Sequence, residues 1–168
     1  MSNLIQDKEV SSSFDKKAFI HKITLYGLAF SLLFSSVVFI FATPYMTVAT
    51  LAYCLMCLGV INRGSPQIHS KFMASAIFID VSLVLVLEVF RSAIKTALAF
   101  SLTFPQQMHI LMSLMAILFY IPIVYLGIQG LKNGLSLNKK KLHMKFGITA
   151  FIFRTLGFIL MFSLLKKA

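Results

Sequence analysis

The most constraining feature of this sequence is the segment from Ile68 to Arg91, which is apolar except for a histidine near its start and charged residues in its middle and at its end. A second segment, Leu142 to Leu165, opens with the same His-x-Lys-Phe pattern. Eleven residues after its histidine the first segment has Asp80, and the second has Arg154 there. Eleven helical residues rise about 16 Å, roughly half of a hydrocarbon core. Two parallel membrane helices would therefore bring opposite charges together near the bilayer centre.

The composition of the whole chain also favours a membrane protein. Of its 168 residues, 58% are hydrophobic and 12% are charged, which is too apolar for a soluble domain of this size. We expect an all-α fold, an integral membrane helical bundle that forms a single transmembrane domain over residues 18–168. Residues 1–17 are more polar and precede an apolar run too long for a signal peptide, so we expect an uncleaved cytoplasmic tail.

Five apolar runs are long enough to cross a bilayer as helices. We expect them at about 18–43, 44–61, 66–90, 105–131 and 142–165, with Thr43, Ser65 and Gly134 at helix ends. The segment 91–104 is expected to extend the third helix and then form a short interfacial piece. A four-span bundle, in which the first hairpin re-enters the membrane, is the alternative.

The distribution of basic residues predicts the orientation of the bundle. Lysine and arginine outnumber acidic residues by 16 to 5, and they cluster between the apolar runs. Topology and anionic lipid headgroups explain this excess without nucleic acid. A cytoplasmic N-terminus places eleven of these bases inside and four outside, which the positive-inside rule favours. The inside group is Lys8, Lys16, Lys17, Lys22, Arg63, Lys71, Lys132, Lys139, Lys140, Lys141 and Lys145, and the outside group is Arg91, Lys95, Lys166 and Lys167.

Three of the expected helices carry a stripe of residues in the same order. Each stripe has a histidine, mostly small residues on the same helix face, and one polar group eleven residues after the histidine. Small residues let membrane helices approach closely, and polar groups at that depth need partners. We therefore expect the stripes to face one another, so that Arg154 pairs with Asp80 and the Tyr120 hydroxyl completes an intramembrane polar cluster. The stripes are His69, Met73, Ala76 and Asp80; His109, Ser113, Ala116 and Tyr120; and His143, Gly147, Ala150 and Arg154.

The expected polar cluster has two interpretations. A charge at the bilayer centre costs at least about 3 kcal/mol when it has no partner, so a matched pair could simply lock the packing of the helices. The same cluster could instead lie on a proton or substrate path. Both interpretations stay open at the level of the sequence.

The four histidines, His21, His69, His109 and His143, are each expected near the first turn of a helix. In the five-span topology His69 and His143 lie at the same depth at the cytoplasmic surface, whereas His109 lies at the outer surface. Neutral imidazole is a good ligand for haem iron, copper and zinc, and paired histidines on facing helices suit bis-histidine haem ligation. The alternative is that these rings simply suit the headgroup zone. His21 is the weakest candidate because its helix face carries leucines and no polar partner.

Cys54 and Cys57 form a C-x-x-C pattern inside the second apolar run. On a helix their sulfurs share a face, close enough for a soft ion such as Cu(I). Cysteine is also an ordinary small apolar residue of buried helices, so both interpretations remain. Phosphate-binding loops, H-E-x-x-H and a nucleophile elbow are absent from the sequence, so we expect a protein that is not an enzyme.

Three stretches of the sequence resemble a known family. They are IHSKFM, MHILMSLMAILFYIPIVYLGIQGLKNG and KKKLHMKFGITAFIFRTLGFILMFSLL, which fall between residues 68 and about 164. The pattern includes a histidine followed four residues later by methionine, a histidine-led helix with an interior proline, and a histidine that opens the last helix. It is similar to that of the small bacterial multi-span membrane proteins of the YozB/CtaM type. The matching positions are His69 and Met73, His109 and Pro122, and His143.

The resemblance implies a protein of the bacterial cytoplasmic membrane that assists assembly or maturation of a haem-copper respiratory oxidase. It also implies that His69, His109 and His143 are candidate contacts for haem or a metal such as copper, and that the partners are the lipid bilayer and an oxidase subunit. The chain departs from the family where Asp80 and Arg154 replace neutral or aromatic residues. A small b-type cytochrome that carries electrons and a small transporter that uses the polar cluster are the alternatives.

Overall fold

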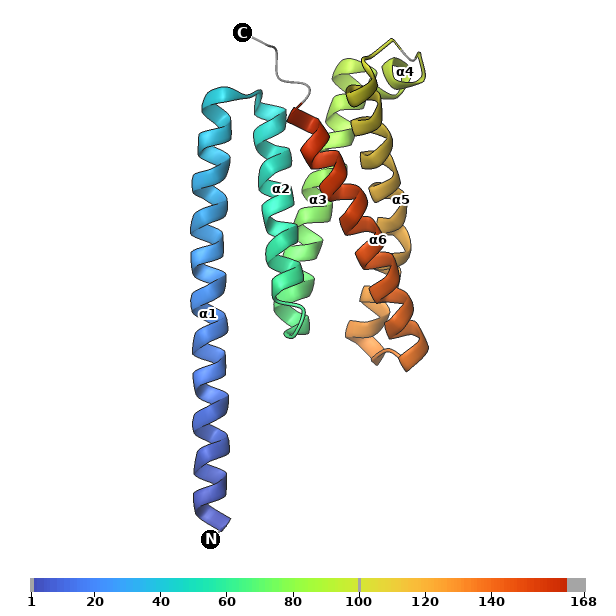
Figure 1. The fold of residues 1–168 in the computed structure, drawn as a ribbon. Coiled ribbons are helices and arrows are strands. Elements are labelled where there is room, and N and C mark those ends of the chain that lie inside the picture. The colour runs from blue at the N-terminus through green and yellow to red at the C-terminus, as the bar shows by residue number, and fades with distance from the viewer. Residues whose placement is uncertain (1, 100, 163–168) are drawn as a thin grey trace.

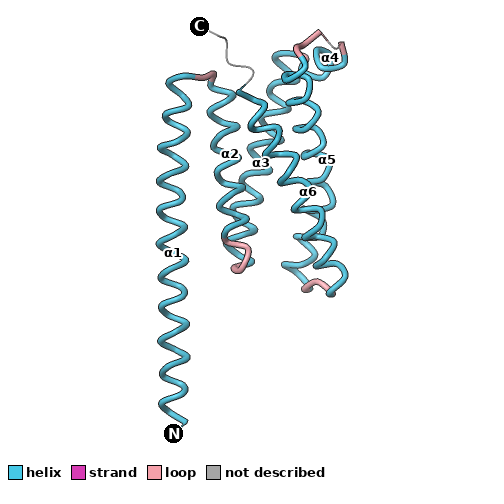
Figure 2. Tube along the Cα trace, in the orientation of Figure 1, coloured by secondary structure: helices cyan, strands magenta, loops and turns pink. Residues whose placement is uncertain are grey.

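The computed structural model describes residues 2–99 and 101–162, and in this part of the chain all regular structure is helical (Figures 1 and 2). Five helices are long and apolar enough to cross a membrane, and a short helix, α4, lies between the third and fourth of them. The all-α bundle with five candidate spans is therefore confirmed. The helices are α1 (Ser2–Phe41), α2 (Pro44–Ile61), α3 (Pro66–Arg91), α4 (Ala93–Leu98), α5 (Phe104–Asn133) and α6 (Leu137–Met161).

The bundle consists of two antiparallel hairpins, α2–α3 and α5–α6, that pack against each other (Figure 1). Contacts between α2 and α6 and between α3 and α5 join the hairpins, and α1 packs along α2. We call the end that contains the α2–α3 and α5–α6 turns the hairpin end, and the opposite end, where α4 lies, the α4 end. The first part of α1 extends beyond the other helices at the hairpin end (Figure 1).

Local sequence signals explain most helix ends. Thr43 has extended backbone geometry before Pro44, and its side chain accepts a hydrogen bond from the Met46 amide, as expected of an N-cap. Ser65 holds the N-cap position of α3 without a capping hydrogen bond from its side chain. At the end of α3, Ser92 takes the left-handed conformation (φ 46°), which separates α3 from α4. Gly134, with φ 71°, ends α5.

Two of the predicted helix starts are wrong. The sixth helix begins at Leu137 rather than at Leu142 because leucine and lysine are good helix formers, and Ser136 takes the N-cap position. The first candidate span begins at Phe19, close to the predicted residue 18, but the helix that contains it already begins at Ser2. His143 and His21 consequently lie well inside their helices rather than in the first turn.

The centre of the bundle is built from the three stripes predicted from the sequence. Ala76 and Ala116 are fully buried and Ala150 is 3% exposed, and each follows its histidine by seven residues. They pack in one apolar cluster with Met56 of α2 and Ile123 of α5. The stripes on α3, α5 and α6 therefore face one another, and α2 closes the fourth side.

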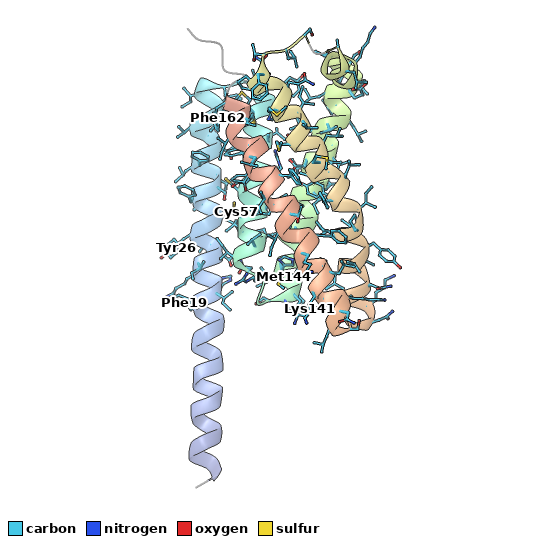
Figure 3. The ribbon with its side chains drawn as sticks, turned by 45° about the vertical axis from the view of Figure 1, so that its right-hand side comes forward. Phe19, Tyr26, Cys57, Lys141, Met144 and Phe162 are labelled. Atoms are coloured by element: carbon cyan, nitrogen blue, oxygen red, sulfur yellow. The ribbon has the colours of Figure 1, made fainter. Side chains whose placement is uncertain are left out.

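The outer surface of the bundle is strongly apolar. Large side chains such as Tyr26, Phe78, Ile121 and Ile159 are between 61% and 73% exposed. Figure 3 shows Phe19 and Tyr26 of α1 pointing away from the other helices. Such a surface is unfavourable in water and suited to hydrocarbon, which agrees with a multi-pass membrane protein.

Candidate functional site

The structure brings Asp80, Tyr120 and Arg154 together in the interior of the bundle. Arg154 donates from Nε to Asp80 Oδ2 at 2.7 Å and from Nη2 to Oδ1 at 2.6 Å. The Tyr120 hydroxyl donates to Oδ2 at 2.8 Å. All three residues are 4–5% exposed, so the two charges are removed from solvent and both carboxylate oxygens accept hydrogen bonds. We call these residues the polar cluster.

Four helices contribute to the polar cluster. Asp80 lies on α3, Tyr120 on α5 and Arg154 on α6, and the backbone carbonyl of Ala49 on α2 accepts from Arg154 Nη2 at 3.4 Å. The buried alanine one turn before each polar residue allows α3, α5 and α6 to approach closely enough for these bonds. The cluster therefore joins the two hairpins, because Asp80 belongs to α2–α3 and Tyr120 and Arg154 belong to α5–α6.

A cavity of about 270 Å³ lies between the two hairpins and reaches the polar cluster. Its lining comes from the parts of α2, α3, α5 and α6 that are nearest to the α4 end, so the cavity occupies that half of the bundle. On the side toward the hairpin end, the apolar cluster around the three buried alanines fills the interior. The walls are mainly apolar, and the polar side chains that line it besides Asp80, Tyr120 and Arg154 include His109 and Ser113.

His109 lies on the wall of this cavity, where its ring is oriented by the backbone of α6. Its Nδ1 lies 2.7 Å from the carbonyl oxygen of Gly157. Because a carbonyl can only accept, Nδ1 carries the hydrogen, and Nε2 is left to interact with other groups. One turn further along α5, Ser113 has a buried hydroxyl that has no hydrogen-bond partner within residues 2–99 and 101–162.

His69 and His143 lie in the other half of the bundle, at the hairpin end. His69 repeats the geometry of His109, since its Nδ1 donates to the carbonyl of Gly59 on the antiparallel neighbour at 2.7 Å. The His143 ring packs against α5, where its Cε1 would lie 3.7 Å from a Cβ added at Gly127, and it interacts with the backbone of Ile123 and electrostatically with His69. Its Nδ1 is buried and has no hydrogen-bond partner within the described part of the chain. The structure therefore places both histidines at the hairpin end and His109 in the other half of the bundle, and we call His69 and His143 the histidine pair.

The separation of the histidines bears on the predicted metal contacts. Among the residues that the structure describes, no group of three or more histidine, cysteine or acidic side chains could hold a metal ion. His69, His109 and His143 thus do not form one metal site. His21 is exposed on α1 and belongs neither to the cavity at the α4 end nor to the histidine pair.

Cys54 and Cys57 are both free thiols on α2. Cys54 is buried and interacts with Ser31 of α1, whereas Cys57 is half-buried beside Tyr53. Both cysteines therefore pack as small apolar side chains between helices. A role in holding a soft metal ion stays a prediction.

Comparisons with protein-family models, with curated proteins and with solved structures found no match. The fold itself defines the class: a multi-span helical membrane protein. Within that class, the chain is distinguished by a buried Asp–Arg–Tyr cluster, a cavity at the α4 end and a histidine pair at the hairpin end.

Proposed function

We propose that this protein binds haem between His69 and His143 and assists the assembly or maturation of a haem-copper respiratory oxidase. The observation that carries the proposal is the geometry of the histidine pair. The Gly59 carbonyl orients the His69 ring and leaves its Nε2 available. His143 lies at the same end of the bundle, and its buried Nδ1 has no hydrogen-bond partner in the described structure, although the ring also interacts with the backbone of Ile123. Histidine ligands in proteins are oriented by hydrogen bonds of this kind.

The number of histidines favours haem over a bare metal ion. A porphyrin supplies four nitrogen ligands, so two imidazoles are sufficient to complete six-coordinate iron. Zinc sites in proteins use three or four side-chain ligands, and the described residues offer no such group. Haem bound here would supply a redox-active iron, while His69 and His143 would hold it between α3 and α6.

The charges around the histidine pair also suit haem, whose propionates are anionic. Lys71 and Lys145 each follow one of the two histidines by two residues and are exposed, and Lys139, Lys140 and Lys141 are exposed at the start of α6. The same lysines would interact with anionic lipid headgroups on the cytoplasmic face, which agrees with a hairpin end that faces the cytoplasm. The link to an oxidase is supported by the family resemblance of the histidine-led helices.

Absorption spectroscopy of the purified protein tests haem binding. We expect a Soret band with about one haem per chain, lost in His69→Ala and in His143→Ala because each variant removes one of the two histidines that would hold the iron. His21→Ala is the matched control, since His21 is exposed on α1. Protein that stays colourless after haem is supplied, or single variants that keep the full band, would contradict the proposal. Cells that lack the chain should contain less assembled oxidase.

A b-type cytochrome that itself carries electrons would use the same histidine pair. The two functions differ in the fate of the haem. An assembly factor should transfer its haem to an acceptor protein, whereas a cytochrome should keep it through repeated reduction and oxidation. Haem retention by the purified chain, mixed with an excess of a haem-free acceptor, distinguishes them.

A transporter remains a second candidate because the cavity reaches the polar cluster from one end of the bundle. In that function Arg154 would exchange its bonds with Asp80 for bonds with a substrate. The charge-swapped variant Asp80→Arg, Arg154→Asp tests the idea. A folded and active swapped protein would argue that the pair is structural.

A further inference from the structure

We infer that the cavity at the α4 end binds a neutral, mainly apolar molecule that has one ring system and oxygen atoms able to form hydrogen bonds. A quinone headgroup is a molecule of this class. The cavity lies in the half of the bundle opposite His69 and His143, so this inference is independent of the haem proposal. Its floor is the polar cluster, and His109 and Ser113 contribute to its wall.

Hydrogen-bonding groups around the cavity have capacity that the protein leaves unused. The Ser113 hydroxyl is buried without a partner in the described residues. His109 donates from Nδ1 to Gly157, so its Nε2 can accept a hydrogen bond. Arg154 uses Nε and Nη2 for Asp80 and Ala49, which leaves the hydrogens of Nη1. Buried polar groups are normally satisfied, so the Ser113 hydroxyl indicates a ligand with hydrogen-bonding atoms, and His109 and Arg154 on the same wall can accept from it and donate to it.

The electrostatics of the cavity favour a neutral ligand over an ion. Asp80 and Arg154 neutralise each other through two short hydrogen bonds. The other polar side chains on the wall carry hydroxyl groups or an imidazole; they are Thr43, Tyr45, His109, Ser113 and Tyr120. A bound anion would have to take Arg154 from Asp80 and leave a carboxylate buried without its partner, and a cation would require the reverse. Either exchange is costly in a low-dielectric interior.

The volume of the cavity and its apolar wall further limit which ligands fit. A volume of about 270 Å³ lies just below the usual range for small-molecule pockets and accommodates a single ring system. Apolar side chains from different helices, including Met46, Val84 and Ile117, would contact the faces of such a ring. A quinone presents carbonyl oxygens that accept from Arg154 Nη1 and Ser113. Its quinol form presents hydroxyls that can also donate to His109 Nε2.

The test is equilibrium binding of 2-methyl-1,4-naphthoquinone to the full chain in lipid nanodiscs, with empty nanodiscs to subtract partitioning into lipid. We expect saturable binding that Val84→Phe weakens at least about tenfold, because the larger side chain fills a wall position. Val86→Phe is the matched control, since Val86 is 40% exposed and does not line the cavity. Ser113→Ala should weaken binding by roughly three- to tenfold through loss of one hydrogen bond.

Three outcomes would overturn the inference: no saturable binding above empty nanodiscs, equal binding by Val84→Phe and Val86→Phe, or saturable binding of 2-naphthoate, an anion of similar size, in place of the quinone. Ser113→Ala breaks no hydrogen bond in the described structure, so it keeps the test decisive if Val84→Phe fails to fold. His69→Ala should retain full quinone affinity while losing haem, which separates failure of this inference from failure of the haem proposal.

Discussion

At the scale of single residues, Asp80 and Arg154 form a buried ion pair between the two hairpins. Both side chains are buried, and the guanidinium contacts the carboxylate through two nitrogens. Desolvation makes such a pair expensive to bury, so the complete pair adds little stability compared with apolar side chains of similar volume. Loss of one member is different because it leaves the other charge buried alone. The two cases can be separated by mutation.

We predict that Asp80→Asn destabilises the protein by about 3–5 kcal/mol, because Arg154 loses its counter-charge. The double variant Asp80→Leu, Arg154→Leu should recover most of this loss, since both desolvation costs disappear together. Unfolding in mixed micelles with increasing denaturing detergent measures both. A double variant as unstable as Asp80→Asn would show that the pair contributes net stability. Wild-type stability with lost activity in the double variant would instead assign the pair a functional role.

At the scale of helices, glycine carbonyls organise each hairpin. Gly59 accepts from His69 across α2–α3, and Gly157 accepts from His109 across α5–α6. The contact between α5 and α6 is especially close at Gly157. A Cβ atom there would lie 2.9 Å from Ser113 Oγ and 3.4 Å from the Ser113 backbone nitrogen. The absence of a side chain at this position therefore allows the histidine to reach the carbonyl.

We predict that Gly157→Ala destabilises the α5–α6 hairpin by about 1–3 kcal/mol, because the added methyl group forces the two helices apart. Adding Ser113→Ala should restore part of the loss, since it removes the closest atom. Gly147→Ala is the matched control on the same helix, because nothing lies within 4 Å of its added Cβ. Thermal unfolding of the four proteins in one detergent measures the effect. Equal losses for the two glycine variants would contradict a role for close packing.

The regular geometry of helices explains which contacts could be predicted from the sequence. A helix has a fixed rise and turn, so the spacing of eleven residues predicted that Asp80, Tyr120 and Arg154 would meet. The same argument could not predict the Gly157 carbonyl as the partner of His109, because that contact depends on how far α5 slides along α6. The start of α6 at Leu137 was missed because lysines fit both a polar loop and a helix.

At the scale of the whole molecule, the two halves of the bundle differ in chemistry. The hairpin end has the histidine pair and the exposed lysines at the start of α6, whereas the α4 end has the cavity. The location of both histidines and of the lysines at the hairpin end could be predicted, because the order of helices and loops along the sequence determines it. The cavity was not predictable, since its volume depends on side chains from four helices and on how the hairpins are placed. Ser113 stood in a predicted stripe, but its unpartnered hydroxyl gave no signal in the sequence.

We predict that the hairpin end faces the cytoplasm, because basic residues are retained on that side of the membrane. In a chain with Cys54→Ala and Cys57→Ala, a single cysteine at Thr96 in α4 should react with a membrane-impermeant maleimide added to intact cells. A single cysteine at Asn138, at the start of α6, should react only after the membrane is opened. Both positions are exposed, so accessibility within the protein is matched. The reverse pattern would place the histidine pair on the outer face and remove the argument that the lysines there meet cytoplasmic lipid headgroups. Labelling of both positions in intact cells would contradict a fixed orientation.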